Sequence, residues 1–223
     1  MGGERDDDAH AQLLFEFKQF LREHKEHLNP ATTFNLISSH GRVEEMLFYA
    51  SIIEDFERVI THYIQRGEHS AALGVLKKAS FSKVEPLFYK FSPVLMLSEP
   101  AETVATWERA ASLDPCQLIP ALVRYSQQQE AHRHRSDENY AIRYLEYCVK
   151  NGNKDAAIHN YLIALYAAHT DEDPLLRFLK SQDSRGGGYV FDLRYALRVC
   201  LRHKKKEACV HIYSAMELYE EAV

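Results

Sequence analysis

Four cysteines, Cys116, Cys148, Cys200 and Cys209, are the residues with the widest scope for nucleophilic, redox or metal chemistry in this sequence. No two of them have the C-x-x-C spacing of a zinc or redox motif. Apolar residues surround them, as in Tyr147-Cys148-Val149. Such thiols usually act as small buried hydrophobic side chains, and they stay free in a reducing compartment. We therefore expect four buried thiols that hold no cofactor.

Histidines form two further arrangements with chemical potential. His24 and His27 are three residues apart, and on a helix this spacing would place both imidazoles on one face, as a metal ion requires. The H-E-x-x-H pattern is not matched, however, and neighbouring basic residues would repel a cation. Ser39 precedes His40, but adjacency in sequence is not a catalytic triad. We expect a solvated helix end at His24–His27, and we assign no catalytic, cofactor-binding or metal-binding residue.

One glycine run and two basic segments could each be either a binding site or an ordinary connection between helices. Gly186–Gly188 lacks the Gly-Lys-Ser/Thr that completes a P-loop, so it reads as a flexible connector. Ala131–Arg135 is predicted to be an exposed interhelical loop before a helix N-cap at Ser136–Glu138, and a partner-binding loop is the alternative. His203–Lys206 is predicted to be charge near a helix C-terminus, because three lysines are too few for a nucleic-acid or lipid site. The protein-binding residues stay unassigned.

Composition limits the class of protein. The chain has 223 residues, with 27 Lys and Arg against 32 Asp and Glu, a net charge of −5, and 46% hydrophobic residues. This apolar content excludes disorder over the whole length, and the acidic balance argues against a nucleic-acid binder. The longest nearly apolar stretch is Tyr161–Ala168, far below the roughly 20 residues of a membrane span. The acidic N-terminus has no hydrophobic core and is not a signal peptide.

Glycine and proline mark the ends of predicted helices. There are nine glycines, too few for a β-rich or dinucleotide-binding chain. Gly41, Gly67 and Gly152 directly follow helical patterns and are predicted to be left-handed C-caps. Helix starts are predicted where Asn or Asp precedes proline, at Asn29–Pro30, Asp114–Pro115 and Asp173–Pro174.

Two details concern the segment after Asp114. Gln117 follows three residues later, which is the spacing of a capping box. Pro120 would lie inside a helix that begins at Pro115. We therefore predict a short turn from Asp114 and a new helix that starts near Pro120.

Apolar residues recur with helical spacing between these signals. Examples are the stripes Val43–Ala50, Ile52–Tyr63, Tyr140–Cys148, Ala157–Leu165 and Cys209–Met216. We find no sustained alternation of period two. The sequence therefore predicts an all-α chain of ten to thirteen short helices.

The helices are predicted to stack as an array. Similar openings recur after turns, at Gly67–Leu73, Gly152–Ile158 and, more weakly, His203–Val210. Their spacing is irregular, which disfavours tetratricopeptide or ankyrin repeats and favours an α-solenoid of stacked antiparallel helical hairpins. Ser181–Tyr189 is the exception to short connections and is predicted to be a mobile loop. We expect residues 1–10 to be disordered or non-native, and residues 11–223 to be a solenoid segment truncated at its C-terminal end.

Four long stretches, Arg42–Ile60, Pro86–Met96, Lys154–Tyr166 and Leu193–Ala208, closely resemble the vacuolar protein sorting-associated protein 18 family of class C subunits of the HOPS and CORVET tethering complexes. The resemblance covers nearly the whole chain. It implies an α-solenoid related to clathrin heavy-chain repeats, which in this family lies between a β-propeller and a C-terminal zinc-binding RING domain. Four scattered cysteines cannot supply the two zinc sites of a RING, so we expect no zinc here.

The resemblance also implies a role. We expect a non-catalytic scaffold segment of a complex that tethers endosomes and lysosomes (or the vacuole) before SNARE-driven fusion, and that lies peripherally on the cytosolic face of these membranes. Its expected partners are other class C subunits and, indirectly, the SNARE machinery, with no nucleic acid. The alternatives are a direct docking surface for another tether subunit or a SNARE-associated factor, and an enzyme whose site is assembled across helices.

Overall fold

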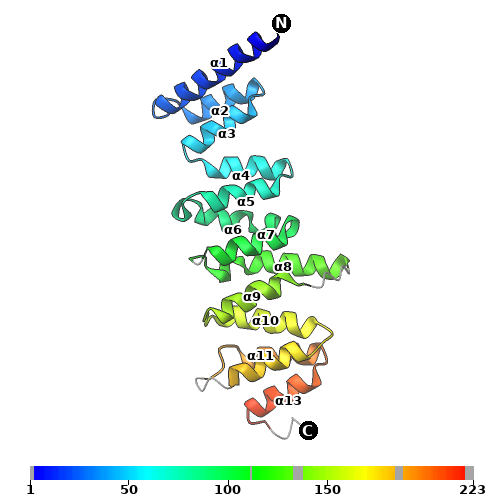
Figure 1. Cartoon of the computed structure of the whole chain (residues 1–223). Coiled ribbons are helices and arrows are strands. Elements are labelled where there is room, and N and C mark those ends of the chain that lie inside the picture. The colour runs from blue at the N-terminus through cyan, green and yellow to red at the C-terminus, as the bar shows by residue number, and fades with distance from the viewer. Residues whose placement is uncertain (1–2, 111, 133–137, 184–187, 219–223) are drawn as a thin grey trace. The chain divides into compact units, whose positions relative to one another are not determined.

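The computed structural model describes residues 3–110, 112–132, 138–183 and 188–218, and every regular element in these ranges is an α-helix (Figure 1). The helices are α1 (Gly3–Glu23), α2 (Pro30–Ser39), α3 (Val43–Ile52), α4 (Phe56–Gln65), α5 (His69–Lys78), α6 (Phe81–Ser98), α7 (Pro100–Arg109), α8 (Pro115–His132), α9 (Tyr140–Lys150), α10 (Ala156–Ala168), α11 (Asp173–Asp183), α12 (Leu193–Arg202) and α13 (Lys206–Ala215). The all-α prediction is confirmed, with the number of helices at the upper end of the expected range.

The chain forms two units, residues 1–87 and 88–223. In the first unit, α1 and α2 pack on α3, α3 packs on α4, and α4 packs on α5. Its core includes Phe34, Ile37, Tyr49 and Val59, and the rings of Phe34 and Tyr49 meet edge to face with centroids 5.1 Å apart. α1 includes residues 3–10, which the sequence analysis separated from the solenoid; their separate origin stays a prediction.

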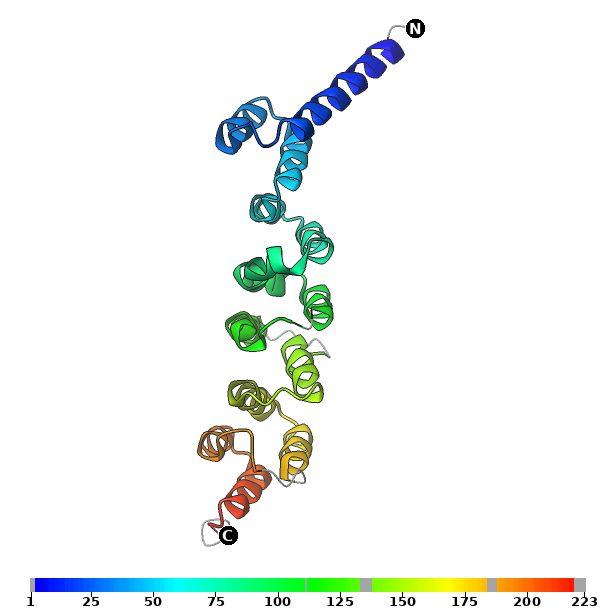
Figure 2. The same cartoon turned by 90° about the vertical axis from the view of Figure 1, so that its left-hand side faces the viewer.

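In the second unit the helices pack against helices one or two places away in the sequence. The contacts join successive helices, as in α9–α10 and α12–α13, and helices two places apart, as in α7–α9, α8–α10, α10–α12 and α11–α13. Figure 2 shows the result for this unit: α8, α10 and α12 form one row, and α7, α9 and α11 form the other. α10 contacts α8, α9, α11 and α12, and it is apolar on almost every side. This is the stacking of antiparallel hairpins that the sequence predicts.

Six helices, α2, α3, α4, α9, α12 and α13, end with the same turn. One residue after the C-cap adopts a left-handed conformation, and the next N–H donates to a carbonyl five residues back, at 2.9–3.3 Å. This is the Schellman motif, which satisfies carbonyls that the end of a helix leaves free. The left-handed residues are Gly41, Glu54, Gly67, Gly152, Lys204 and Glu217. The three predicted glycine caps are confirmed, and three charged residues occupy the same position without a glycine signal.

Helix starts are confirmed at Asn29 and Asp114. Asn29 Oδ1 accepts a hydrogen bond from Thr32 N at 3.1 Å, and Asp114 Oδ1 accepts one from Cys116 N at 3.0 Å. Asp173 itself is the first residue of α11, and its N–H donates to the side chain of Asp171 at 3.0 Å. The cap therefore comes from two residues upstream of the predicted position.

The prediction of a helix break at Pro120 is wrong. α8 runs from Pro115 to His132 without interruption. Pro120 lies in the second turn, where its missing N–H removes only the bond to the Cys116 carbonyl, and the fully buried Leu118 and Leu122 hold the helix on either side. The capping box is only half formed as well, because the Asp114 N–H donates to Tyr89 Oη at 2.9 Å and Gln117 Nε2 donates to the Asp114 carboxylate at 3.2 Å.

Two predicted connections differ from the structure. α9 is capped by Asn139, whose Oδ1 accepts from Ala141 N and Ile142 N at 3.0 and 3.3 Å, and not by the segment that begins at Ser136. Residues 133–137 lie outside the described part of the chain. The predicted loop at 181–189 begins later than expected, because α11 continues to Asp183, and residues 184–187 also lie outside the described part.

Candidate protein-docking surface

The four thiols are poorly suited to chemistry. All are free; Cys148, Cys200 and Cys209 are buried, and Cys116 is half-buried. Burial raises the pKa of the Cys200 thiol from 9.0 to about 12, and it raises that of Cys148 to about 11. For Cys116, burial and a hydrogen bond to the Asp155 side chain raise the pKa to about 12. Only the thiolate is a strong nucleophile or metal ligand. The predicted burial is therefore confirmed for Cys148, Cys200 and Cys209, whereas Cys116 is only partly buried.

His24, His27 and Ser39 take no part in a catalytic arrangement among the described residues. His24 follows the end of α1 and His27 lies in the next turn; both are exposed, which confirms the predicted solvated helix end. The hydroxyl of Ser39 donates to the Leu36 carbonyl at 2.8 Å and is not aligned with a base. Within the described residues no group of three or more His, Cys, Asp or Glu side chains is placed to hold a metal ion.

α12 is fixed at both ends by polar contacts with the preceding hairpin. At its start the Asp192 carboxylate accepts from Arg194 N and Tyr195 N at 2.8 and 3.2 Å, and Asp192 N donates to Asn160 Oδ1 of α10 at 3.0 Å. On its inner face, the side chains of Ala196 and Cys200 are completely buried. The side chains on its outer face are therefore carried by a well-anchored helix.

The turn between α12 and α13 contains a lysine with a role that the sequence analysis missed. Lys205 is only 7% exposed, and its Nζ donates to the carbonyls of His169 and Thr170 at 2.6 and 3.1 Å. In return, Glu172 Oε1 accepts from Ala208 N, at the start of α13, at 2.9 Å. The predicted cluster of surface charge is thus divided, with Lys205 turned inward. The sequence analysis placed a helix end here, but no glycine marks the left-handed position, which Lys204 occupies, and nothing indicated that Lys205 turns inward.

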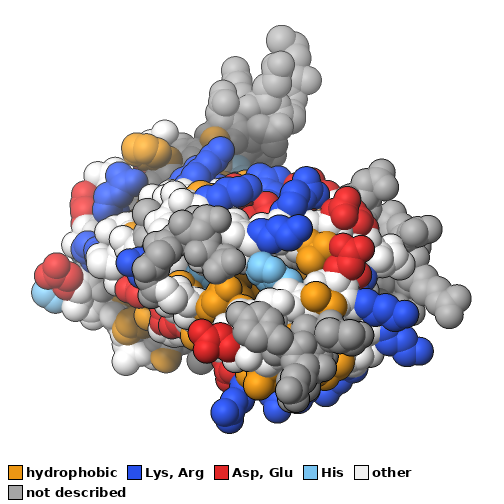
Figure 3. All heavy atoms as spheres, turned by 90° about the horizontal axis from the view of Figure 1, so that it is seen from below, with side chains coloured by type: hydrophobic (Ala, Val, Ile, Leu, Met, Phe, Trp, Pro, Cys, Tyr) orange, Lys and Arg blue, Asp and Glu red, His pale blue; other side chains and the backbone are white. Residues whose placement is uncertain are grey.

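The outer face of α12 is basic. Arg194, Arg198 and Arg202 are exposed at intervals of four residues, and the exposed Lys204 and Lys206 extend this charge over the following turn. We call these five residues the basic face. Leu193–Ala215 contains six lysines and arginines against one glutamate, in a chain of net charge −5. The face drawn in Figure 3 has Lys and Arg side chains beside hydrophobic ones, with Asp and Glu interspersed.

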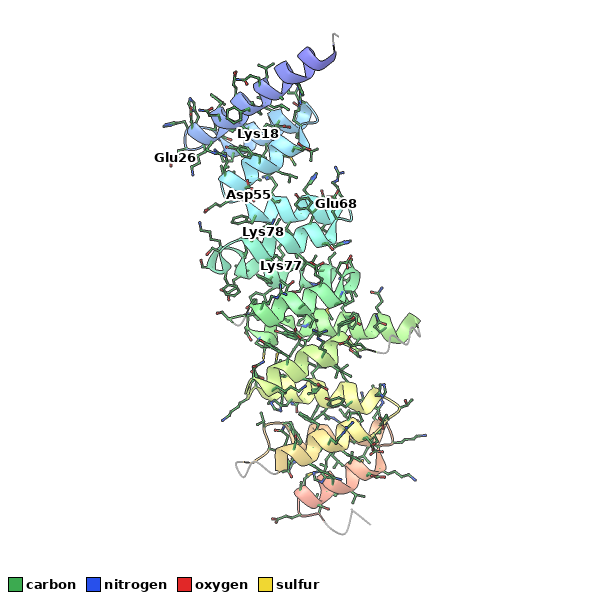
Figure 4. All side chains as sticks on the ribbon, in the orientation of Figure 1. Lys18, Glu26, Asp55, Glu68, Lys77 and Lys78 are labelled. Carbon is green, nitrogen blue, oxygen red and sulfur yellow. The ribbon has the colours of Figure 1, made fainter. Side chains whose placement is uncertain are left out.

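A second open surface lies in the first unit, between α1 and α2. Leu13, Leu14 and Phe17 of α1 face Leu36 and Ile37 of α2 across a groove of about 490 Å³. The polar residues that line it are His10, His40, Arg42 and Glu45. Lys18, labelled on α1 in Figure 4, places its Nζ 3.9 Å from the buried carboxylate of Glu45. The groove is thus mainly apolar, with both cationic and anionic side chains in its lining. These features do not favour one kind of bound molecule over another.

Comparison with known proteins matches one family along the whole chain. A family model described as "VPS18, alpha-solenoid domain, second half" matches residues 56–223, and the corresponding first half matches residues 1–55. The chain is 42% identical to "Vacuolar sorting protein 18" of Arabidopsis thaliana and 44% identical to "Vacuolar protein sorting-associated protein 18 homolog" of Danio rerio, over 98% and 99% of its length. It is 30% identical over 95% of its length to "Vacuolar membrane protein pep3" of Schizosaccharomyces pombe.

The chain spans 22% of the Arabidopsis protein and 23% of the other two. None of the helices in the described ranges combines the length and apolarity that crossing a bilayer would need. The stacked helices and the match over the full sequence lead to one assignment. The chain belongs to the vacuolar protein sorting-associated protein 18 family, and it is a segment of that family's α-solenoid domain.

Proposed function

We propose that this segment is a non-catalytic scaffold within an endosome- and lysosome-tethering complex of the HOPS and CORVET type. A stack of helices holds the modules at its ends in a defined arrangement, and no bond is made or broken. The proposal draws on family membership and on the names of the relatives, which refer to vacuolar sorting.

The observation that carries the proposal is the way successive hairpins of residues 88–223 are fixed to one another. Besides their apolar contacts, they are joined by polar links between helices two places apart. The Arg143 guanidinium of α9 donates two hydrogen bonds to the Glu108 carboxylate of α7, at 3.2 and 3.3 Å. Tyr147 Oη donates to the Glu108 carbonyl at 2.6 Å. Lys205 and Glu172 join the next hairpins in the same way. At these two places the directional bonds restrict sliding of one helix past another, which a positional scaffold requires.

The proposed partners follow from the family. They are other class C subunits of the tether and, through them, the SNARE machinery, without nucleic acid. The proposed location is the cytosolic face of late endosomes and lysosomes, or of the vacuole, where the complex holds the segment peripherally.

A direct docking surface for another tether subunit or a SNARE-associated factor is the second candidate. The basic face favours it, because five exposed cations on α12, the following turn and the start of α13 create a positive potential that attracts an acidic partner.

A replacement experiment separates the two. This chain is substituted for the matching segment of the zebrafish relative, and it is compared with a version that lacks α12 and α13 and with an Arg198→Glu version. A scaffold predicts that removing the hairpin impairs lysosome fusion while class C subunits still co-purify, and that Arg198→Glu has no effect. Loss of one subunit with Arg198→Glu would favour docking. Normal fusion after removal of the hairpin would refute the scaffold.

A further inference from the structure

We propose that the basic face binds an acidic amphipathic helix of a protein partner, with its carboxylates against Arg194, Arg198 and Arg202. The inference deepens the docking candidate and does not depend on the scaffold role. It rests on the spacing, the pairing and the boundaries of these charges.

The spacing of the three arginines matches the spacing of side chains on a partner helix. Residues four apart on α12 rise about 6 Å along its axis, so Arg194 and Arg202 are about 12 Å apart along the helix. Glutamates at i, i+4 and i+8 on a partner helix repeat with the same period. Guanidinium groups bind carboxylates through two parallel hydrogen bonds, so three such pairs would fix both register and orientation.

The cations of the basic face are available. In the described residues, none of the recorded ion pairs involves Arg194, Arg198, Arg202, Lys204 or Lys206. The Arg198 guanidinium lies 5.6 Å from the centroid of the Tyr195 ring, which supports its side chain without neutralising its charge. A partner carboxylate would therefore not have to displace an internal one.

Two exposed apolar side chains lie on the same two helices as these charges. Leu201, which precedes Arg202 on α12, is 52% exposed, and Val210 of α13 is 47% exposed. A partner helix with one leucine next to its acidic stripe could cover Leu201 and add a short-range attraction that salt does not screen. This feature favours an amphipathic helix over a polyacidic tail.

The ends of the basic face argue against a bilayer or a nucleic acid. Asp192, two residues before Arg194, is the N-cap of α12, and Glu207 lies in the first turn of α13. These two carboxylates bound the positive region to a few helical turns, whereas membranes and phosphate backbones present negative charge continuously. The net charge of −5 adds long-range repulsion from such polyanions.

The test uses the intact 223-residue chain and three synthetic 16-residue probes. The first peptide is helical, with glutamates at positions 3, 7 and 11 and leucines on the adjoining face. The second replaces the glutamates with glutamine, and the third keeps three glutamates but places them on different faces. Fluorescence anisotropy at about 50 and 150 mM salt measures their binding. Vesicles of phosphatidylserine and phosphatidylcholine test the membrane alternative by co-sedimentation.

We expect the first peptide to bind at least about 10-fold more tightly than the other two. We expect Arg198→Glu to weaken that binding by at least about 10-fold, because it replaces a paired charge with a like one. Arg124→Glu is the matched control, since Arg124 is an exposed arginine on α8, away from the basic face, and its binding should equal that of the parent. Equal binding of all three peptides would overturn the proposal. Arg198-dependent binding of the vesicles that exceeds binding of the peptide would also overturn it, in favour of a membrane site.

Discussion

Lys205→Met tests whether a buried lysine stabilises the packing of α12 and α13 against the turn that follows α10. Methionine keeps most of the aliphatic length but removes the ammonium group, so the carbonyls of His169 and Thr170 lose donors at 2.6 and 3.1 Å. Hydrogen bonds from a charged donor contribute about 1.5–3 kcal/mol each.

The net loss will be smaller than two such bonds. Removing the ammonium group also removes the cost of burying a charge, and His169 and Thr170 lie in an exposed turn where water can replace part of the interaction. We expect the free energy of unfolding to fall by about 2 kcal/mol. For a unit of this size, the melting temperature should fall by about 7 °C.

Thermal unfolding followed by circular dichroism measures this change. Lys206→Met is the matched control, because Lys206 is exposed, is the next residue in the chain and should change stability by no more than about 0.5 kcal/mol. Hydrogen exchange should show faster exchange in α13 for Lys205→Met alone. If the two variants melt together, the ammonium group contributes no net stability and the reasoning fails.

Three further predictions address the turns, the links between layers and the thiols. Lys204→Gly should stabilise the chain by about 1 kcal/mol, because glycine adopts the left-handed conformation at φ 57° without strain; an unchanged or lower melting temperature would contradict this. A double-mutant cycle of Arg143→Met and Glu108→Gln should give a coupling of about 0.5–1 kcal/mol, since the arginine is partly exposed; a coupling of zero would mean that the pair is only a contact. Burial raises the pKa of the Cys148 and Cys200 thiols, so the folded state retains protons that the unfolded state releases near pH 9.0. Stability should therefore be unaffected by these thiols below that pH and decrease as pH rises from 9 toward 12; a melting temperature that rises between pH 8.5 and 10.5 would refute the sign.

The sequence predicted best those features that depend on local chemistry. Asn29 and Asp114 cap helices because the side-chain oxygen of a short residue reaches nearby N–H groups wherever the chain turns into a helix. Gly41 and Gly67 end helices because a left-handed residue without a Cβ atom is unstrained. Such signals need no knowledge of the rest of the fold.

Features that depend on tertiary contacts were missed. Pro120 weakens α8 locally, but the burial of Leu118 and Leu122 outweighs one lost hydrogen bond. Glu54 ends α3 in the left-handed conformation that glycine would favour, and its carboxylate pairs with Lys83 of α6. Lys205 looked like its exposed neighbours, because nothing in the sequence places the turn at 169–170 beside it.

Nor did the sequence identify the docking surface. Arg194, Arg198 and Arg202 can be seen to share one face once α12 is placed, but their availability depends on where the carboxylates of other helices lie. That information is held in the packing and not in the spacing of residues along the chain.

The central position of α10 determines where residues 88–223 can open. It contacts α8, α9, α11 and α12, and its buried side chains include Ile158, Leu162 and Ile163. Separating this helix would expose apolar surface on four others at once, whereas the described residues of α13 pack mainly on α11 and α12. Openings of residues 88–223 that leave α10 in place will therefore be more frequent than those that separate it, so helices of this unit that open can pack again on one that stays folded.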